Sequence, residues 1–548
     1  PGKGWEWIVY NNNDQPILTQ DAVQRGKASK EWRYTKYDAF GRVTSTGIYT
    51  NTATNSYTTQ EQMANFVNTH TGPLWEERNG ATTYPTTTFP TAGVGIVIKP
   101  HLVNYYDDYT FTGASSLAIQ GHTRNDNVKT LLTGSLVYRA DGTQGLLTVN
   151  YYDSRARLIQ SVSENHLKGT DRITNEYTFT GELTKSTRVH SAKSASTTIV
   201  HKNEYDQVGR LLTSKHKIGN QDTVVLASNA YNEIGQLRKK SIGGDKDGAN
   251  FHTLVDYAYN ERSWLDKASS AHFSYDLDYN VNNANATLTG AQYNGNIAQQ
   301  LWGHGATTNS TFVYQYDALN RLRNASSSGA SIMVEAFNYD DMGNITSLAR
   351  NNGVTTATTS TSYTYNNGNK SNRLASLSGA ITGSYTYDVN GNATKDRTGM
   401  TIGYNHLNLP DTVYNSGGSV RIGYLYDGLG TKLRKYSTQG GIRDYVGGIE
   451  YGATAIELIH TGEGVAYRNS NGSYTYRYNL TDHLGNVRST VYRNPTNNAV
   501  EVLQRDDYYA FGKQKVVAGG NNKYLYNGKE KQYDFGGHYD YGARFYDA

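Results

Sequence analysis

A short motif that recurs along the chain constrains its fold more than any other feature of the sequence. Each copy begins with Tyr-Asp or Tyr-Asn and continues with two variable residues and then Gly, which one copy replaces with Asn. A polar residue and usually an apolar one follow, in six copies at residues 37–43, 205–211, 231–237, 316–322, 339–345 and 387–392. In the second half, the tyrosines at positions 316, 339, 365 and 387 lie 23, 26 and 22 residues apart. Such regular spacing indicates a repeated supersecondary unit.

The motif fits the turn of a β-hairpin. Asp at the second position accepts backbone hydrogen bonds, and Gly at the fifth position takes the positive φ that closes a three-residue loop with a bulge. Asp317 then faces Arg321, and Tyr316 faces Leu322; such cross-strand pairs contribute about 0.2–1 kcal/mol each. We therefore assign a structural role in hairpin turns to Tyr37, Asp38, Gly41, Tyr205, Asp206, Gly209, Tyr316, Asp317, Asn320, Tyr339, Asp340, Gly343, Tyr387, Asp388 and Gly391.

Three copies depart from the consensus at or after the turn. Asn320 replaces Gly, and Asn tolerates the left-handed region. Ala156 holds the Gly position of the copy at residues 152–158, where left-handed Ala costs about 1–2 kcal/mol, so we expect another loop geometry there. In the copy that begins at Tyr426 the apolar residue moves to Leu433, which leaves the strand register open.

The aromatic content separates this chain from disordered proteins of similar polarity. Hydrophobic residues make up 36%, and the mean hydropathy is −0.67. However, the chain has 47 Tyr against 12 Phe and 6 Trp, whereas disordered chains are poor in aromatic residues. A tyrosine ring packs on a half-exposed sheet while its hydroxyl reaches polar groups. The composition, with 56 Gly and 8 Pro, favours many short strands joined by tight turns.

Hairpins in series predict an all-β shell. One hairpin cannot bury its own apolar face, and a long sheet accumulates twist until it curls. We therefore predict a spiral of β-hairpins that forms a hollow cocoon over residues 1–479. The repeat is weakest at about residues 50–100, where residues 60–70 can form a short helix and residues 84–90 read as a loop.

Charge and cysteine content exclude several classes. The 52 basic and 48 acidic residues are scattered, and the densest basic run, residues 238–240, fits a solvated strand end. Nucleic-acid binding would require clustered Lys and Arg, so we expect no nucleic-acid partner. The absence of Cys excludes disulfides and thiolate metal sites. No apolar run approaches the ~18–20 residues of a membrane helix, so we expect no membrane span.

Four further motifs follow one another near the C-terminus. They are Asp-His-Leu-Gly-Asn-Val-Arg at residues 482–488, and the segments 507–512, 524–530 and 539–547. In this order, behind the Tyr-Asp repeats, they resemble the RHS-repeat-associated core of YD-repeat proteins, with Ala510 where the family usually has Pro. We take residues 480–548 as this core. Its signature residues are Asp482, His483, Gly485, Asn486, Arg488, Tyr541, Gly542, Arg544 and Tyr546.

The resemblance implies a fold and a biological setting. RHS proteins form hollow β-cocoons whose core plugs one end, and they often enclose a C-terminal effector, commonly a toxin. The resemblance therefore implies an exported or cell-surface protein. Many members cleave themselves at an aspartate site just after the core, but the sequence reaches Ala548 before that motif. We therefore assign neither cleavage residues nor an effector.

Candidate catalytic and metal-binding residues have simpler structural explanations. As a general base His483 would need a positioned partner, whereas a structural His needs only the carbonyls of its own turn, which is the role we expect. Asp388, Asn390 and Asn392 alternate like a calcium loop, but Ala393 and Gly399 replace its Gly and Glu. Phosphate-loop, dinucleotide and nucleophile-elbow patterns are missing. The two carboxylates of a glycosidase have no fixed spacing in the sequence, so the possibility of such a pair stays open. We expect no enzyme activity, cofactor or metal.

Two functions remain. We favour a non-catalytic shell or scaffold that encloses or docks another polypeptide, an effector or secreted cargo, with secretion-machinery or surface proteins as further partners. The alternative is a cell-surface binding module whose tyrosine ridges recognise glycans or a partner protein. In the first case we expect an exposed end at residues 539–548, where RHS proteins continue into cargo.

Overall fold

The computed structural model describes residues 3–78, 80, 82–85, 87–282 and 284–548. Within these residues the strands form one sheet of 25 strands, one of 14 and one of 3. The helices are α1 (Ala22–Gly26), α2 (Gln60–Asn68) and the irregular turn α3 (Asn366–Asn369), with short 3-10 turns at Thr52–Thr54, Ala114–Leu117 and Tyr526–Gly528.

The first sheet runs from β1 to β25. Its first strands are β1 (Trp7–Tyr10), β2 (Pro16–Gln20), β3 (Glu31–Tyr37), β4 (Val43–Asn51), β5 (Ile96–Tyr106), β6 (Leu132–Tyr138), β7 (Gly145–Tyr152) and β8 (Leu158–Glu164). The next are β9 (Thr170–Tyr177), β10 (Leu183–Ala192), β11 (Ala195–Tyr205), β12 (Leu211–Ile218), β13 (Val224–Tyr231), β14 (Leu237–Gly244), β15 (Thr253–Tyr259), β16 (Leu265–Ser269) and β17 (Ser274–Asp278). The last are β18 (Gln299–Gly303), β19 (Ser310–Tyr316), β20 (Leu322–Gly329), β21 (Val334–Tyr339), β22 (Ile345–Asn351), β23 (Thr358–Tyr365), β24 (Leu374–Gly379) and β25 (Gly383–Ser384).

The other two sheets follow in the chain. The second comprises β26 (Thr386–Tyr387), β27 (Ala393–Lys395), β28 (Thr401–Tyr404), β29 (Pro410–Tyr414), β30 (Val420–Tyr426), β31 (Lys432–Ser437) and β32 (Gly441–Val446). It continues with β33 (Ile449–Tyr451), β34 (Ile456–Thr461), β35 (Gly464–Arg468), β36 (Tyr474–Thr481), β37 (Val487–Arg493), β38 (Val500–Tyr508) and β39 (Gln514–Ala518). The third comprises β40 (Glu530–Gln532), β41 (His538–Asp540) and β42 (Phe545–Tyr546).

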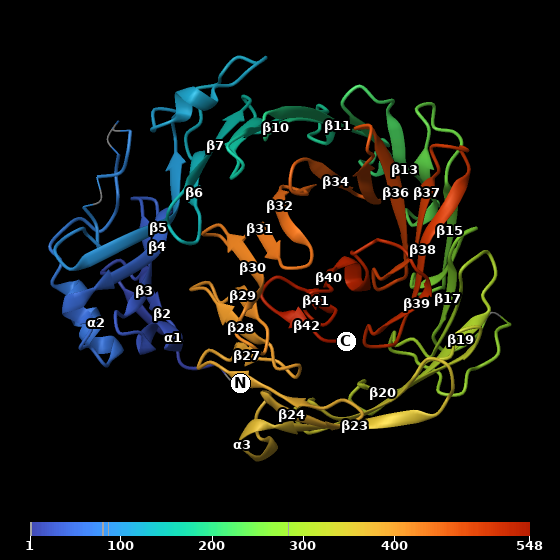
Figure 1. The fold of residues 1–548 in the computed structure, drawn as a ribbon. Coiled ribbons are helices and arrows are strands. Elements are labelled where there is room, and N and C mark those ends of the chain that lie inside the picture. Colours follow the sequence, from blue (N-terminus) through green and yellow to red (C-terminus); the bar gives the residue numbers. More distant parts are fainter. Residues whose placement is uncertain (1–2, 79, 81, 86, 283) are drawn as a thin grey trace.

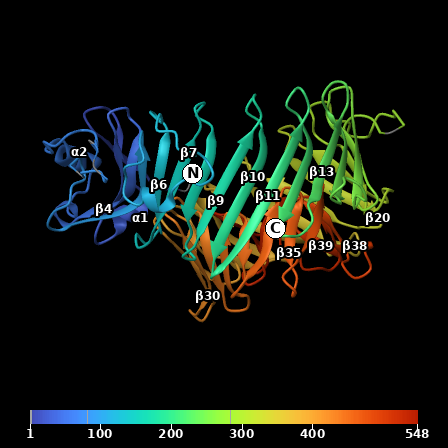
Figure 2. The same ribbon diagram turned by 90° about the horizontal axis from the view of Figure 1, so that it is seen from above.

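The strands form a continuous antiparallel meander that coils on itself. Each strand pairs with the next one in the sequence within its sheet, for example β3 with β4, β4 with β5 and β5 with β6. The first sheet wraps around a central space, and the second continues the spiral partly inside it (Figure 1, Figure 2). This arrangement confirms the predicted all-β spiral. The boundary proposed at residues 479/480 falls within β36, which belongs to the second sheet.

The hairpin turns have the geometry that the motif predicts. Asp206 Oδ1 accepts hydrogen bonds from the backbone N–H of Val208 and Arg210 at 3.0 and 2.9 Å. The guanidinium of Arg210 reaches the other oxygen of Asp206 at 2.6 Å. Gly209 and Gly343 have φ of 81° and 84°, so the expected positive φ is confirmed. Such a turn is closed by one left-handed residue and one side-chain oxygen, which belongs to a carboxylate in the Asp copies and to an amide where Asn replaces Asp, as at Asn232.

Two departures from the consensus follow the common geometry. Ala156 has φ 61°, and Asp153 Oδ1 accepts from the N–H groups of Arg155 and Arg157 at 2.8 and 2.9 Å. The expectation of another loop was therefore wrong, because these bonds together outweigh the strain of one left-handed Ala. In the copy whose register was left open, Tyr426 faces Lys432, six residues later, which is the register of the other copies.

A ladder of tyrosine hydroxyls joins each hairpin to the one before it. Tyr231 Oη donates to the carbonyl of Leu211 at 2.9 Å, and Leu211 is the residue that faces Tyr205 in the preceding hairpin. We call this set the tyrosine ladder. It comprises Tyr37, Tyr106, Tyr152, Tyr177, Tyr205, Tyr231, Tyr259, Tyr279, Tyr316, Tyr339, Tyr365, Tyr387, Tyr404, Tyr426 and Tyr508.

Arginine reinforces several steps of the ladder. The guanidinium of Arg210, already bonded to Asp206, lies 4.8 Å from the ring centre of Tyr231 in the next hairpin. Arg321 lies at the same distance from Tyr339. Such cation–π contacts contribute about 0.5–1 kcal/mol at exposed sites. The motif therefore stabilises both its own turn and the joint between hairpins.

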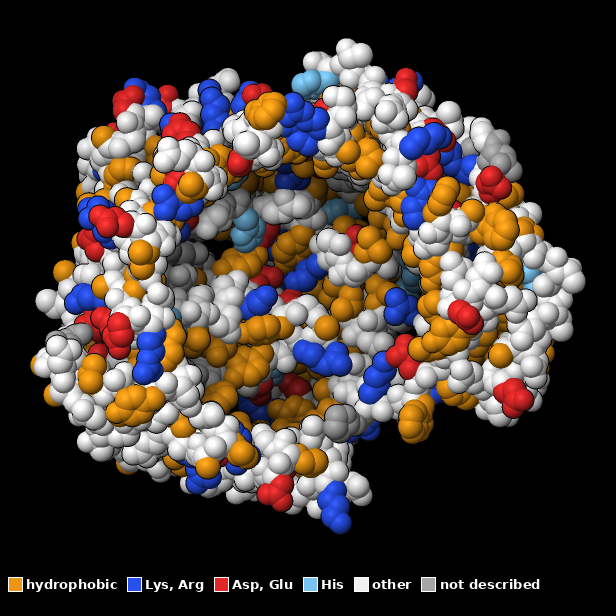
Figure 3. Space-filling view, turned by 180° about the vertical axis from the view of Figure 1, so that it is seen from behind, with side chains coloured by type: hydrophobic (Ala, Val, Ile, Leu, Met, Phe, Trp, Pro, Cys, Tyr) orange, Lys and Arg blue, Asp and Glu red, His pale blue; other side chains and the backbone are white. Residues whose placement is uncertain are grey.

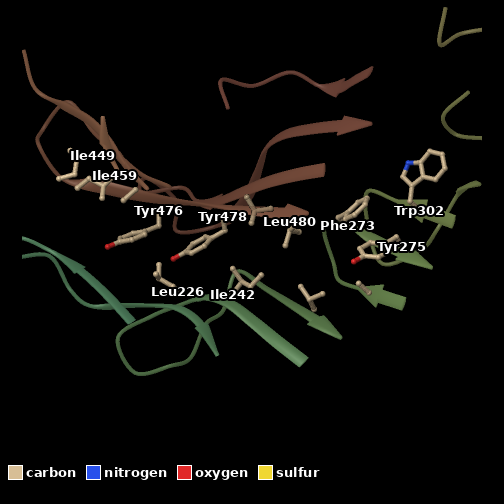
Figure 4. Packing of buried hydrophobic residues seen from close by; sticks show 14 of the residues in the cluster. Leu226, Ile242, Phe273, Tyr275, Trp302, Ile449, Ile459, Tyr476, Tyr478 and Leu480 are labelled. Atoms are coloured by element: carbon tan, nitrogen blue, oxygen red, sulfur yellow. The ribbon is translucent and has the colours of Figure 1, made fainter. Parts of the chain in front are cut away.

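The largest hydrophobic core lies between the two coils of the spiral. Leu226 and Ile242 of the first sheet face Tyr476 and Tyr478 of the second (Figure 4). The cluster extends along the interface to Trp302. Two histidines of the first coil add polar contacts, because the rings of His190 and His216 lie 2.6 and 2.8 Å from the hydroxyls of Tyr451 and Tyr476. Coiling thus buries the apolar face that a single sheet would leave exposed.

The insertion between β4 and β5 contains the predicted short helix. α2 lies on the outer side of the wall and packs Met63 and Val67 against Trp32 and Tyr49 (Figure 1). The described part of residues 84–90 forms no helix or strand, as predicted, and Thr86 lies outside the described residues. None of the described helices has the length and apolar character needed to cross a membrane.

Exchanging the turn residues should separate conformational strain from packing. Nothing would touch a Cβ at Gly343, so Gly343→Val should lower the free energy of unfolding by about 1–2 kcal/mol through φ alone. Ala156→Gly should raise it by about 0.5–1 kcal/mol. Urea midpoints test both changes. The control is Gly423→Val, a β30 position with open space, where Val should be neutral; equal losses at Gly343 and Gly423 would contradict the turn geometry.

Removing one rung of the ladder should loosen one joint. Tyr231→Phe removes the hydroxyl donor of the Leu211 carbonyl, which keeps the amide of Asn229 as a donor at 3.0 Å, so we expect the loss of one hydrogen bond, about 0.5–1.5 kcal/mol. Hydrogen exchange should accelerate mainly in β12–β14. Tyr10→Phe is the control, because Tyr10 is half exposed and outside the ladder. Unchanged exchange in Tyr231→Phe would show that the ladder is not stabilising.

Candidate functional site

The C-terminal residues lie inside the spiral. Residues 519–548, here called the lumen segment, leave β39 and form the three-stranded sheet at the centre of Figure 1. Leu525, Phe535 and Tyr539 of this segment are buried, with exposed fractions of 0%, 1% and 2%. The backbone oxygen of Ala548 accepts a hydrogen bond from Arg350 at 3.4 Å. The expected exposed end at residues 539–548 is exposed only in part, because residues 541–544 are exposed, residues 545–548 are half-buried, and Tyr539 and Asp540 are buried.

Ion pairs explain why the lumen segment stays inside. Lys435 Nζ donates to Glu530 Oε1 at 3.0 Å and to Gln532 Oε1 at 2.7 Å. Lys432, on the same strand β31, forms an ion pair with Asp540. Arg397 Nη2 lies 3.0 Å from Asp547 Oδ1. Cations of the second coil thus meet carboxylates of the segment along most of its length.

The first core signature motif holds the start of this segment. Asp482 closes the turn, because its Oδ1 accepts from the N–H groups of Leu484 and Asn486 at 3.0 Å each. Gly485 has φ 79°, as in the other turns. Asn486 Oδ1 then accepts the backbone N–H of Asn527 at 2.9 Å. The motif is a repeat turn that also binds the lumen segment.

Arg488 lies at the centre of a buried charge cluster. Its Nη2 donates to Asp507 Oδ1 at 2.7 Å, and its Nη1 lies 3.3 Å from Asp482 Oδ2. The same oxygen of Asp507 accepts the indole N–H of Trp302 at 2.9 Å and contacts the ring of His304 at 3.0 Å. Trp302 and His304 belong to the first coil. The cluster therefore fastens the core to the outer wall.

Ion pairing within this cluster opposes the effect of burial on the pKa of its charged groups. Burial by itself would raise the pKa of Asp507, but Arg488 and the hydrogen bond from His304 hold it well below its usual range. Burial by itself would lower the pKa of Arg488, and the two carboxylates raise it above its ordinary value. The arrangement is an ion-paired anchor with both charges retained.

His483 does not have the bonds that were expected of it. Its Nδ1 is buried and has no hydrogen-bond partner within the described part of the chain, and its ring centre lies 6.1 Å from that of Tyr275. Burial lowers its pKa, which favours the neutral ring. The expectation that His483 bonds turn carbonyls is wrong, because Asp482 already closes the turn. The ring instead packs against the first coil.

The second group of signature residues forms the last hairpin. Tyr541 and Arg544 close the turn between β41 and β42 through a backbone bond of 3.0 Å, with Gly542 at φ 83°. Tyr541 Oη donates to Asn527 at 2.6 Å, and Tyr546 Oη donates to the carbonyl of Phe511 at 2.7 Å. Tyr541 thus joins two parts of the lumen segment, and Tyr546 joins the segment to the turn that follows β38.

Several residues of the site have no sequence signal. Lys435 and Arg397 belong to no motif, and Lys432 holds the position of a repeat copy that is usually apolar; the partners of all three lie about 100 or more positions away in the chain. Trp302 and His304 lie about 200 positions from Asp507. The one available sign in the sequence is a charged residue at a strand position where an apolar residue is expected. Asp388 and Asn392, the calcium-loop candidates, hydrogen-bond within their own turn.

The space-filling view shows a hollow at the centre of the molecule (Figure 3). Lys and Arg side chains and hydrophobic side chains border this hollow. Among the described residues, no three His, Asp or Glu side chains are grouped in a way that could hold a metal ion.

Comparisons with known proteins bear on the fold. No family model and no curated protein matches the chain. Crystal structures of TcdB2-TccC3, with and without Cdc42, match it over its whole length with TM-scores of 0.67 at 15% and 14% identity. A Tc holotoxin pore of Photorhabdus luminescens matches equally, at 15% identity. The chain spans about a quarter of these structures' chains, 26%, 26% and 25%. At this identity the likeness establishes the fold.

The Arg488 cluster should be a major contribution to stability. Arg488→Met leaves Asp507 and Asp482 buried without their cation, and breaking a buried pair in this way costs about 3–5 kcal/mol. The urea midpoint should fall and proteolysis between the coils should accelerate. Arg544→Met is the control, since Arg544 is exposed. A loss below that of one surface pair, about 1 kcal/mol, would contradict the anchoring role.

Proposed function

We propose that this chain is a non-catalytic shell of the RHS type that encloses another polypeptide, an effector or secreted cargo. The observation that carries the proposal is the lumen segment. The inner face of the second coil binds this stretch of polypeptide through ion pairs such as Lys435–Glu530 and through buried aromatic rings such as Phe535. A surface that holds one extended polypeptide in this way can hold the continuation of that polypeptide or a second one.

The structural matches support the same proposal. They are named as complexes of TcdB2 with TccC3, and one of them includes Cdc42. One is named as a Tc holotoxin pore, which supports export from the producing cell. By analogy of fold, secretion-machinery or cell-surface proteins are the further partners that we propose. Our proposal that the chain is of the RHS type rests on its four core motifs together with this fold.

The alternative function receives less support from the tyrosines. Glycan binding through a tyrosine-rich surface requires exposed rings, but the ladder tyrosines use their hydroxyls within the wall. The tyrosines with more than a third of their surface exposed, among the described residues, are Tyr10, Tyr293, Tyr436, Tyr533 and Tyr541. They lie in different parts of the chain and form no ridge along one sheet.

The proposal extends to the absence of catalysis. The buried carboxylates of Glu335, Glu450, Glu530 and Asp507 each contact an Arg or Lys. Asp278 differs, because burial and the nearby Asp266 raise its pKa to about 6. A raised carboxyl pKa is what a glycosidase acid requires, so Asp278 is the residue with which to test the proposal.

Protease access should reveal whether polypeptide after Ala548 is enclosed. We fuse a protease recognition sequence directly after Ala548 and, for comparison, directly before Pro1. Cleavage after Ala548 should be at least tenfold slower, because the site can be cut only after local opening. A ~40-residue Gly/Ser linker, which spans about 35 Å on average, should restore cleavage. Lys435→Gln should raise the rate near Ala548, while Lys246→Gln, at an exposed turn, should not.

Equal cleavage rates at the two ends would overturn the shell proposal. A second result would also contradict it, namely turnover of a polysaccharide that disappears in Asp278→Asn while the fold is retained. That outcome would identify an enzyme. A chain that lacks turnover and protects the fused sequence supports a non-catalytic container.

A further inference from the structure

A cavity of about 200 Å³ lies on the inner face of the second coil, where the lumen segment begins. Tyr476 and Tyr478 of β36 point to the first coil (Figure 4). Side chains alternate along a strand, so Arg477 and Asn479 point to the opposite, inner side. Residues 521–524 cover these side chains and complete the cavity wall.

Two cations of this cavity, Arg477 and Lys523, are in direct contact with no carboxylate of the described residues. Arg477 stacks on the ring of Tyr467, 3.9 Å from its centre, and donates to the neutral amide oxygen of Asn521 at 2.8 Å. Lys523 lines the same cavity. Among the described residues, neither forms an ion pair with a carboxylate. The cations that hold the lumen segment, such as Lys435, each have one.

The acidic residues of the cavity are already engaged. Glu450 and Glu457 each lie 2.6 Å from a guanidinium nitrogen of Arg443. The site thus has three cationic side chains against two acidic ones, besides the ring of His460 that contacts Glu450. Burial lowers the pKa of Arg477, and burial together with the nearby Arg443 lowers the pKa of Lys523; the attraction of Glu457 does not offset this lowering in either residue. A bound anion would relieve this imbalance.

We propose that this cavity binds the carboxylate of an aspartate or glutamate side chain of the enclosed polypeptide. The proposal rests on the shell function proposed above. The volume exceeds the about 30 Å³ of a water molecule and is smaller than the roughly 300–1,000 Å³ of most small-molecule sites, so it suits one side chain. Arg477 and Lys523 supply the charge, and the amide of Asn522, 3.1 Å from Thr490 Oγ1, supplies a polar wall.

The test uses N-acetylglutamate as the probe and N-acetylglutamine as its neutral counterpart. Saturation-transfer NMR titrations of the whole chain should show saturable binding of N-acetylglutamate and at least tenfold weaker binding of N-acetylglutamine. Arg477→Gln and Lys523→Gln should each weaken N-acetylglutamate at least tenfold, the size of one charge-assisted hydrogen bond. Lys246→Gln makes the same charge change at an exposed turn and should leave binding unchanged.

Equal binding of the two probes, or unchanged binding in both variants, would overturn the proposal. Far-UV circular dichroism shows whether each variant folds, and Arg477→Lys, which keeps the charge, should retain more binding than Arg477→Gln. Protease protection of a sequence after Ala548 reports on the shell function independently. Protection without N-acetylglutamate binding would refute this cavity alone, whereas binding without protection would refute the shell.

Discussion

The hydrogen bond from each ladder tyrosine to the preceding hairpin is the interaction on which the wall depends. The Asp and Gly of the motif make a hairpin, but they do not determine how one hairpin meets the next. The bond from Tyr231 to Leu211 holds that offset together with the backbone pairing of β12 with β13, and the same bond recurs from hairpin to hairpin along the wall. The hydroxyl must remain protonated to donate, and burial secures this by raising the pKa of Tyr404 to about 12.

A curved wall needs something to cover its inner face, and the second coil provides it. Tyrosine is suited to both sides of this contact, because its ring contributes apolar area and its hydroxyl satisfies polar groups such as His216. The core signature adds the charged anchor of Arg488 with Asp507. The low overall hydrophobicity of the chain is therefore compatible with a large interior.

The sequence was sufficient to predict the structural features that repeat along the chain. The register of Tyr316 with Leu322 and the φ of Gly209 follow from local rules that act within seven residues. Ala156 shows the limit of such rules, because the bonds of Asp153 outweigh one unfavourable conformation. Pairs such as Lys435 with Glu530 could not be predicted, since they depend on how far the wall has curved when the chain returns. The same holds for the interior position of the C-terminal strands.

The strict neighbour-to-neighbour pairing has a consequence for how such a molecule can change in length. A whole hairpin inserted into the meander would leave every other turn and rung intact, because each strand contacts only its sequence neighbours within the sheet. The contacts between coils would respond differently. Each hairpin adds about 10 Å of circumference, so Asp507 would no longer arrive opposite Trp302. The circumferences of the two coils must therefore match, and an insertion in one coil requires a matching insertion in the other.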